Sequence, residues 1–506
     1  MSNFLIEDKC YTLSDIYQCI QQSHTISLSK SIKDRILSSR NILSSSINKG
    51  NVIYGVNTGF GKLSSIKIDD SELNTLQNNL LMSHAAGVGP PVSNNIVKLM
   101  MLLKILSLSK GYSGVRLELV DKLLEFINRG CIPIVPSQGS VGASGDLAPL
   151  SHMSLPLIGL GELVYNSKKF IASKLLDTLK IKSIRLQYKE GLALINGTQF
   201  STAYGVDCIM KLKKLLRIAD IAGAISTEGL MGTDHPFLTK VNKLKMHTGQ
   251  MEVANNLCNL LNESQIRNSH VDCDRVQDMY SIRCMPQVHG ACRDSIKSAS
   301  IMIENEMNSV SDNPLIFSDG DVISSGNFHA ESVSQAMDIA AIAATELGKI
   351  SERRIFALTK GDFGLPPFLI HNPGINSGIM MWQVTAAALS SENKGLSYPA
   401  SVDTIPTGAD QEDHVSMAPW AGRKLYQIIN NLENILSIEI LCGCMAIDFR
   451  KDLKPGIGVK CAYDIVKKHI NEITEDKILQ TEIKNINSLI QSDDLIKTVQ
   501  TKIKLK

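Results

Sequence analysis

Apolar residues recur along most of the chain at the three- and four-residue spacing that is typical of amphipathic helices. The pattern is clearest over residues 32–47, 117–127 and 425–442. A glycine soon follows each of the first two segments and predicts a helix end. Segments that favour strands are few and short, namely residues 51–56, 132–135 and 315–317. The pattern therefore predicts a mainly α protein.

The composition narrows the class of protein. Of the 506 residues, 43% are hydrophobic but only 5% are aromatic, so the core must be mainly aliphatic. The 52 basic and 50 acidic residues give a net charge of +2, which provides no basic surface for nucleic acid and no acidic tail. Only 16 prolines occur, so long helices can run uninterrupted. We expect a loop-rich domain over residues 1–200 and a long-helix domain over residues 201–506.

Three features of the sequence bear on where in the cell the protein is located. Residues 1–10 include acidic side chains and no apolar run long enough for a signal peptide. No stretch of about 18 apolar residues stands out as a membrane span. The eleven cysteines are odd in number and scattered, which favours reduced thiols over a disulfide framework. We expect a cytoplasmic protein with no membrane or nucleic-acid partner.

Residues 136–149, Pro-Ser-Gln-Gly-Ser-Val-Gly-Ala-Ser-Gly-Asp-Leu-Ala-Pro, form the most informative segment of the chain. Its glycines recur at a spacing of three residues and make the backbone unusually permissive. Asp146 is expected to cap a following helix, with Pro149 in the first turn.

This segment has four interpretations. A tight loop before a helix explains most glycine- and serine-rich clusters. A phosphate cradle lacks the Gly-Lys-Ser/Thr of a P-loop, and Asp146 would place negative charge beside the phosphate. A serine nucleophile elbow needs one residue between the serine and the next glycine, whereas Gly145 directly follows Ser144. The fourth interpretation is self-processing of Ala143, Ser144 and Gly145 into an electrophile.

The sequence Gly-Ala-Ser-Gly-Asp-Leu-Ala-Pro-Leu-Ser at residues 142–151 resembles the signature of the aromatic amino-acid ammonia-lyases. In that family the tripeptide cyclises to 4-methylideneimidazole-5-one, the prosthetic group. The resemblance implies that the Gly145 amide nitrogen attacks the Ala143 carbonyl carbon. Two waters then leave, one on ring closure and one from the Ser144 side chain. Glycine allows the close approach and serine has a hydroxyl that can be eliminated, so no external cofactor is expected.

Further motifs occur in the family's order up to about residue 450. Tyr-Gly-Val-Asn-Thr-Gly-Phe-Gly at residues 54–61 resembles the loop that carries the catalytic tyrosine. Other segments that resemble the family lie at residues 196–199, 277–283, 312–314 and 326–329. Together they imply a loop-rich N-terminal domain followed by a long helical bundle like that of fumarase and aspartase. They also imply a homotetramer whose active sites take residues from more than one subunit.

Two positions favour histidine over phenylalanine or tyrosine as the substrate. His84, within residues 83–89, and Glu412, within residues 411–414, resemble the members of the family that act on histidine. An imidazole ring carries a hydrogen-bond donor and an acceptor, which these side chains can pair. A phenyl ring would leave a buried carboxylate unpaired. The resemblance therefore implies conversion of L-histidine to trans-urocanate and ammonia.

The resemblance also implies roles for individual residues, beginning with those that hold and deprotonate the substrate. Tyr54 would remove the β-proton, and a tyrosine needs a nearby positive or electrophilic group to do so at neutral pH. Arg283 would hold the substrate carboxylate through a two-point contact. Asn196 and Gln277 would bind that carboxylate or polarise the prosthetic group.

Three further residues complete the implied site. Tyr280 would assist cyclisation or proton transfer, and Phe328 would pack against the ring system. Glu412 would either bind the imidazole or take a proton, and the sequence leaves both roles open. The chain departs from the family pattern at a few positions, which are Met279, Met285, His289, Ala330 and Asp410.

Three other classes of protein compete with the lyase interpretation. A metal site can be built from Cys273, Cys284, His289 and Cys292, but their spacing matches no zinc motif and we expect no metal. An aminomutase would share the prosthetic group and return ammonia to the β-carbon. A catalytically inactive scaffold would have no need for the intact Ala-Ser-Gly tripeptide together with the catalytic tyrosine and arginine.

Overall fold

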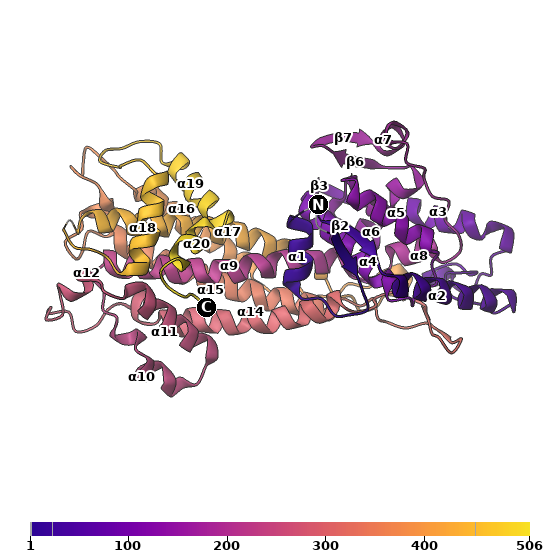
Figure 1. Cartoon of the computed structure of the whole chain (residues 1–506), viewed down its shortest axis with the longest axis horizontal. Helices are drawn as coiled ribbons and strands as arrows, with labels where there is room; N and C mark the ends of the chain where they lie inside the picture. Colours follow the sequence, from indigo (N-terminus) through magenta and orange to yellow (C-terminus); the bar gives the residue numbers. More distant parts are fainter. Residues whose placement is uncertain (1–2, 23, 451) are drawn as a thin grey trace. The chain divides into compact units, whose positions relative to one another are not determined.

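The computed structural model describes residues 3–22, 24–450 and 452–506, and most of them are helical (Figure 1). The three helices that the hydrophobic pattern predicts are present as α2 (Lys30–Asn48), α5 (Leu117–Asn128) and α17 (Ala418–Asp448). The glycine after each of the first two has a positive φ, the left-handed conformation that commonly ends a helix. The mainly α fold class is therefore confirmed.

The predicted strands are only partly confirmed. Strands β4 (Ile132–Pro133) and β8 (Leu315–Ile316) are shorter than expected. The strand expected over residues 51–56 is wrong, because the Ile53 carbonyl accepts hydrogen bonds from the amides three and four residues later and the segment turns. The Asn57 side-chain oxygen also accepts from the Ile53 amide at 2.7 Å. These local hydrogen bonds outweigh the β propensity of the apolar residues.

The chain forms two compact units. The first comprises Met1–Met210, Ser300–Asp338 and Pro399–Arg423, and the second comprises Lys211–Ala299, Ile339–Tyr398 and Lys424–Lys506. The boundary expected at residue 200 lies close to the end of the first segment. The return of two later segments to the first unit has no signal in the sequence pattern.

Helix α4 (Asn94–Ser109) lies inside the first unit. Every side chain from Leu99 to Ser109 is buried. Helices α1 (Leu13–Gln21), α2 and α5 pack against it. A helix surrounded in this way is apolar on nearly all faces, which explains why its sequence shows little amphipathic periodicity.

Three shorter helices of the first unit carry the loops described below. Helix α6 (Leu147–Ser154) packs against α3 (Leu73–His84) and α8 (Glu190–Ile195). The strands form small sheets, one of which joins β4, β6 (Glu162–Tyr165) and β7 (Lys168–Ile171) in antiparallel order. The strands thus pair locally, and helix packing builds the core.

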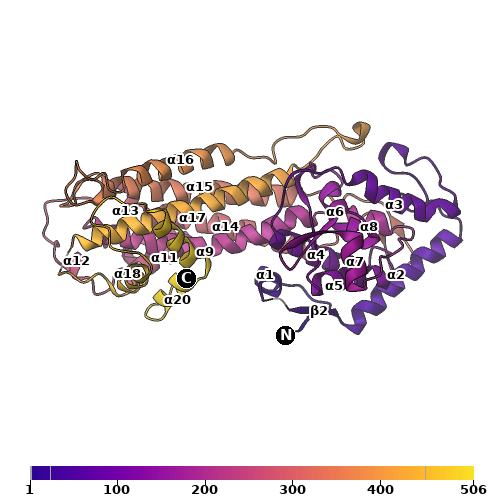
Figure 2. The same ribbon diagram turned by 90° about the horizontal axis from the view of Figure 1, so that it is seen from above.

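The second unit is a bundle of long helices. Helices α9 (Gln199–Gly229), α14 (Met285–Met307) and α15 (Glu331–Thr359) run beside α17 (Figures 1 and 2). Aliphatic side chains fill most of the buried faces of these helices. The arrangement matches the long helical bundle that the family resemblance implies.

A polar network also crosses this bundle. Arg354 of α15 donates to Glu439 of α17, with Nη2 and Oε2 3.0 Å apart. His289 of α14 donates from Nδ1 to Asp220 of α9 at 2.9 Å. All four side chains are fully buried, and burial lowers the pKa of His289. His289 departs from the family pattern, and its buried imidazole is hydrogen-bonded to the Asp220 carboxylate inside the bundle.

Helix α17 contains an 18-residue window apolar enough to span a membrane. The expectation that the chain contains no stretch apolar enough to span a membrane is therefore wrong. However, 89% of that window is buried inside the protein. The core helix of a bundle has the same apolar composition for a different reason, because it is surrounded by other helices.

Candidate active site

The Ala-Ser-Gly tripeptide is anchored at its N-terminal side by a neighbouring loop. The Val141 carbonyl accepts from the Met417 amide at 2.9 Å. The Gly142 carbonyl accepts from the Ser416 hydroxyl at 3.1 Å. These two contacts fix the entry to the tripeptide against the start of α17.

On the C-terminal side, Gly145 lies against the backbone of Gly197 with a φ of 78°. A Cβ atom on residue 145 would lie 2.2 Å from the Gly197 carbonyl oxygen, far closer than van der Waals contact allows. The Asp146 amide donates to the same carbonyl at 2.8 Å. Only glycine fits this approach, as the self-processing interpretation requires.

Asp146 directly precedes α6, as predicted, but its side chain does not cap that helix. The carboxylate instead accepts from the amide and the hydroxyl of Ser201, both at 2.8 Å, at the start of α9. Burial raises the pKa of Asp146 to about 6, and the hydrogen bonds from Ser201 oppose that shift. The partner is 55 residues away in the chain, so local pattern gives no signal for it.

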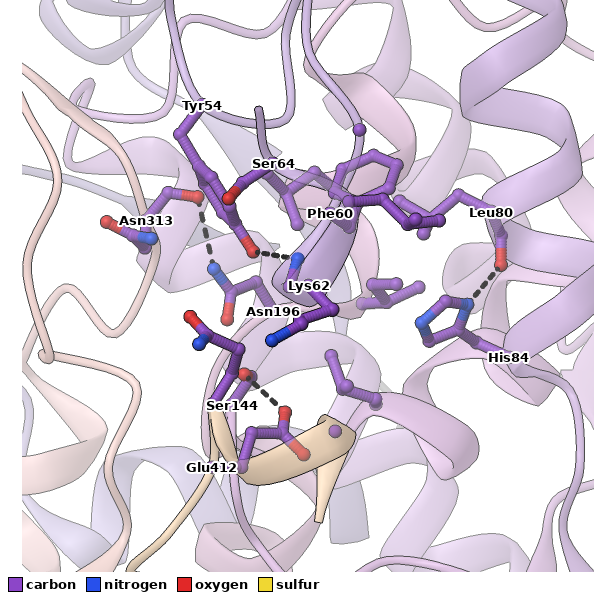
Figure 3. A pocket seen from close by; sticks show the side chains of 18 of the residues that line it. Tyr54, Phe60, Lys62, Ser64, Leu80, His84, Ser144, Asn196, Asn313 and Glu412 are labelled. Atoms are coloured by element: carbon purple, nitrogen blue, oxygen red, sulfur yellow. Dashed lines mark hydrogen bonds between the residues drawn. The ribbon is translucent and has the colours of Figure 1, made fainter. Parts of the chain in front are cut away.

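Ser144 and Glu412 meet although they are 268 residues apart. The Ser144 hydroxyl donates to Glu412 Oε1 at 3.0 Å (Figure 3). The other carboxylate oxygen, Oε2, accepts from the Thr407 hydroxyl at 2.7 Å. Both oxygens of Glu412 are therefore paired.

Ser144 and Glu412 line a cavity of about 930 Å³ in the first unit. Tyr54, His84, Asn196 and Phe328 line it as well, so six predicted site residues share one space. Much of the remaining wall is aliphatic and includes Leu63, Ile66, Leu76, Leu80, Leu192 and Ile195. An apolar cavity of this size with a few polar groups is typical of a small-molecule site.

Tyr54 is held in the turn that replaces the expected strand. Its hydroxyl oxygen accepts from the Gly61 amide at 3.1 Å. Its ring meets the Phe60 ring edge-on, with centroids 6.4 Å apart. These contacts fix the phenol oxygen at the cavity wall (Figure 3).

His84 ends α3 and offers one ring nitrogen to the cavity. Its Nδ1 lies 2.9 Å from the Leu80 carbonyl oxygen. Burial lowers the pKa of His84, although the Leu80 carbonyl and Glu412 act in the opposite direction, so the ring is neutral at pH 7. Because a carbonyl only accepts, Nδ1 carries the proton and Nε2 is left as an acceptor (Figure 3).

Asn196 follows α8 and is only 2% exposed. Its Nδ2 donates to the Asn313 carbonyl at 3.1 Å (Figure 3). Its Oδ1 is buried and has no hydrogen-bond partner among the described residues. Buried acceptors without partners are rare, so this oxygen is available to a hydrogen-bond donor in the cavity.

Of the five other predicted site residues, Ala143 and Gly145 flank Ser144 without lining the cavity. Gln277, Tyr280 and Arg283 belong to the second unit and do not line it either. Tyr280 is 69% exposed, and its ring centroid lies 4.5 Å from the Arg283 guanidinium carbon. The Nε of Arg283 is buried without a hydrogen-bond partner in the described part of the chain. Tyr280 and Arg283 therefore lie against each other.

Lys62 and Asn313 also line the cavity, and neither was predicted to be a site residue. Figure 3 shows the Lys62 side chain reaching into the cavity. Lys62 directly follows the glycine-rich turn that carries Tyr54, and Asn313 lies within the motif at residues 312–314. Their position in or next to these motifs could have identified both as candidate site residues.

The alternative of a metal site at Cys273, Cys284, His289 and Cys292 is not supported. Across residues 3–22, 24–450 and 452–506, no group of three or more His, Cys, Asp or Glu side chains is arranged to hold a metal ion. His289 instead pairs with Asp220. The cysteines are free thiols.

A helical frame that presents a glycine-anchored serine, a histidine and a carboxylate to one apolar cavity defines an enzyme of small-molecule chemistry. The family model for aromatic amino acid lyases matches residues 11–468. The histidine ammonia-lyase of Myxococcus xanthus is 43% identical over 98% of each chain. The solved structure of histidine ammonia-lyase from Trypanosoma cruzi has a TM-score of 0.92 and 39% identity, and covers 100% of this chain and 96% of that one. Tyrosine aminomutase from Streptomyces globisporus has a TM-score of 0.94 and 29% identity, with 100% of both chains covered.

The chain therefore belongs to the aromatic amino acid lyase family. The fumarase-like long-helix fold that the resemblance implies is confirmed, as is the prediction of a lyase enzyme.

We expect Gly145→Ala to destabilise the first unit strongly. The added Cβ has no space against Gly197, and the positive φ disfavours alanine. Overpacking costs about 1–3 kcal/mol, and the left-handed backbone adds about 1–2 kcal/mol. Urea unfolding followed by circular dichroism measures the combined loss.

Gly320→Ala is the matched control for this change. Gly320 also has a positive φ, of 100°, but a Cβ there would meet nothing within 4 Å. It should lose only the backbone contribution. Equal destabilisation by the two variants would contradict a close approach at Gly145.

Proposed function

We propose that this protein is a histidine ammonia-lyase, which converts L-histidine to trans-urocanate and ammonia. The observation that carries the proposal is that Ser144 of the tripeptide lines the same cavity as His84 and Glu412. Similarity over nearly the full length to histidine ammonia-lyases of two organisms supports the same substrate.

We infer that Ala143, Ser144 and Gly145 are converted to 4-methylideneimidazole-5-one. The residues suit this group, because Ala143 is small and buried and Gly145 makes the close approach that a side chain would prevent. The anchors at Gly142 and Gly197 would hold the ring in place. The group supplies the electrophile that encoded side chains lack.

The loss of the Ser144 hydroxyl has a consequence for Glu412. In the encoded chain its Oε1 accepts from Ser144 and its Oε2 from Thr407. Removing the Ser144 oxygen leaves Oε1 without a donor in a largely apolar cavity, where an unpaired carboxylate oxygen is unfavourable. A ring N–H of histidine is a donor that would satisfy it. Self-processing thus prepares the cavity to recognise imidazole.

His84 gives the cavity a second acceptor, because its Nε2 carries no proton when Nδ1 donates to Leu80. Together with the Glu412 carboxylate it provides two acceptors, which suit the protonated form of the substrate ring, because only the imidazolium presents two N–H groups. A phenyl ring has no donor for either of them, so its binding would leave both desolvated and unpaired. This difference favours histidine over phenylalanine.

We propose roles for the remaining site residues as well. Tyr54 is the base that removes the β-proton, with its hydroxyl held by the Gly61 amide. Asn196 accepts a hydrogen bond from the substrate through its unpaired Oδ1. Phe328 packs against the rings from the cavity wall. The substrate carboxylate then requires a cation, which is the role of Arg283.

We propose a homotetramer in which Gln277, Tyr280 and Arg283 of one subunit complete the cavity of another. The exposure of apolar side chains supports an interface, because Val276 is 94% exposed and Tyr280 69%. Helix α16 (Met380–Leu396) likewise leaves Met381 63% exposed. Clusters of exposed apolar side chains are typical of protein–protein contacts.

Free thiols at the cysteines support a cytoplasmic location, because disulfides are rare in that reducing compartment.

The second candidate function is an aminomutase, which the fold similarity to the tyrosine aminomutase favours. An aminomutase returns ammonia to the β-carbon instead of releasing it. His84 and Glu412 favour histidine as substrate in either case, and the product distinguishes the two activities.

Purified protein without added cofactor should convert L-histidine to trans-urocanate with one ammonia per product. The new conjugated double bond gives a near-ultraviolet absorbance that follows the reaction. Ser144→Ala should fold normally and show no turnover, because a small loop side chain contributes little packing. β-Histidine as the main product would favour the aminomutase. Turnover of phenylalanine with none of histidine would contradict the substrate assignment.

The double variant His84→Leu/Glu412→Gln should lower kcat/KM for histidine by about 100-fold or more, because both acceptors for the ring are removed. Activity on phenylalanine should fall less or rise. Asp413→Asn is the matched control, since this neighbouring carboxylate does not line the cavity. Retained preference for histidine in the double variant would show that these residues do not read the ring.

A further inference from the structure

Two lysines are buried next to Asn196 without lining the cavity. Lys104 of α4 is 1% exposed, and Lys189, just before α8, is fully buried. Neither contacts the space where a substrate would bind. Burying an ammonium group is strongly unfavourable unless it is paired or hydrogen-bonded, so their contacts indicate what they stabilise.

Lys104 holds the main chain at Asn196. Its Nζ donates to the Asn196 carbonyl at 2.6 Å and to the Ala193 carbonyl at 3.1 Å. Burial lowers the pKa of Lys104 to about 7, while Asp312 and Asp146 favour its charged form. A neutral amine keeps two N–H groups, so both contacts persist in either protonation state.

Lys189 holds the acceptor of the Asn196 side chain. Its Nζ donates to both carboxylate oxygens of Asp312, at 2.8 and 2.9 Å, and to the Asn313 carbonyl at 2.9 Å. That Asn313 carbonyl also accepts from Asn196 Nδ2. The backbone and the amide of Asn196 are therefore fixed by separate lysines.

The amide orientation of Asn196 follows from these contacts. A flipped amide would place Oδ1 against the Asn313 carbonyl oxygen, and two acceptors cannot pair. The observed orientation leaves Oδ1 buried, unpaired and in a residue that lines the cavity. It is an acceptor prepared for an N–H group of the substrate.

We propose that Lys104 is a positioning residue of the lyase site, which acts by holding the Asn196 carbonyl while the Lys189–Asp312 pair holds the Asn196 amide. This inference rests on the proposed function. Lys104 does not line the cavity, and of the two residues whose carbonyls it holds only Asn196 does, so we expect its effect on turnover to pass through Asn196. Removing Asn196's side chain should therefore make the enzyme indifferent to Lys104.

The test is a double-mutant cycle on kcat/KM for L-histidine with Lys104→Met, Asn196→Ala and the combined variant. Lys104→Met should lower kcat/KM by about 100-fold, the loss expected when a site residue is misplaced by about 1 Å. In the Asn196→Ala background the same change should alter kcat/KM by less than about threefold, because coupled residues are not additive. Lys104→Arg keeps donors for both carbonyls and should remain within about tenfold of the wild type.

Other outcomes are equally decisive. The role of Lys104 would be overturned if the loss of kcat/KM in the combined variant equalled the product of the two single losses. It would also be overturned if Lys104→Met left kcat/KM unchanged. Neither result would affect the proposed lyase activity. A wild-type protein without histidine turnover would overturn both. If Lys104→Met does not fold, Lys104→Gln, which keeps a shorter donor, takes its place in the cycle with the same expected cancellation.

Discussion

The Gly197 carbonyl oxygen lies where any side chain on residue 145 would have to be, and it accepts the Asp146 amide at 2.8 Å. This contact ties the Ala-Ser-Gly tripeptide to the turn between α8 and α9. The Asp146 carboxylate strengthens the tie by accepting from Ser201 at the start of α9. Because Asn196 directly precedes Gly197, the same turn also fixes the cavity amide. The tripeptide and the group facing it are therefore positioned by one piece of backbone.

The first unit contains several buried ionisable groups, and burying such groups disfavours folding. Asp146, Lys104 and Lys189 are all buried, and burial shifts the pKa of each toward its neutral form. Lys104 bonds to the carbonyl of Asn196, Lys189 to Asp312 and Asn313, and Asp146 to Ser201 at the start of α9. Clusters of buried ionisable groups with shifted pKa values are typical of functional sites. The first unit thus uses polar contacts to hold loops in positions that apolar packing does not specify.

The sequence predicted the parts of this protein that depend on local pattern or on a known motif. Helical periodicity identified α2, α5 and α17, and the motifs identified six residues that line one cavity. Local pattern failed at residues 51–56, where Asn57 bends an apolar run into a turn. It also failed at Asp146, whose partner Ser201 is distant in the chain. Lys104 gave no signal, because a lysine in an apolar helix reveals its role only when its acceptors are known.

Ala143, Ser144 and Gly145, anchored at Gly142 and Gly197, are proposed to become the electrophile of the enzyme. Trypsin cleaves after Arg129 and Lys168, so mass spectrometry of the peptide spanning residues 130–168 examines the tripeptide directly. We expect a peptide lighter than its encoded mass by two waters, about 36 Da, with the loss confined to residues 143–145. The same peptide from the Ser144→Ala variant should not show the two-water loss, because alanine has no hydroxyl to eliminate. A peptide of full encoded mass from protein that turns over histidine would show that the tripeptide is not the electrophile.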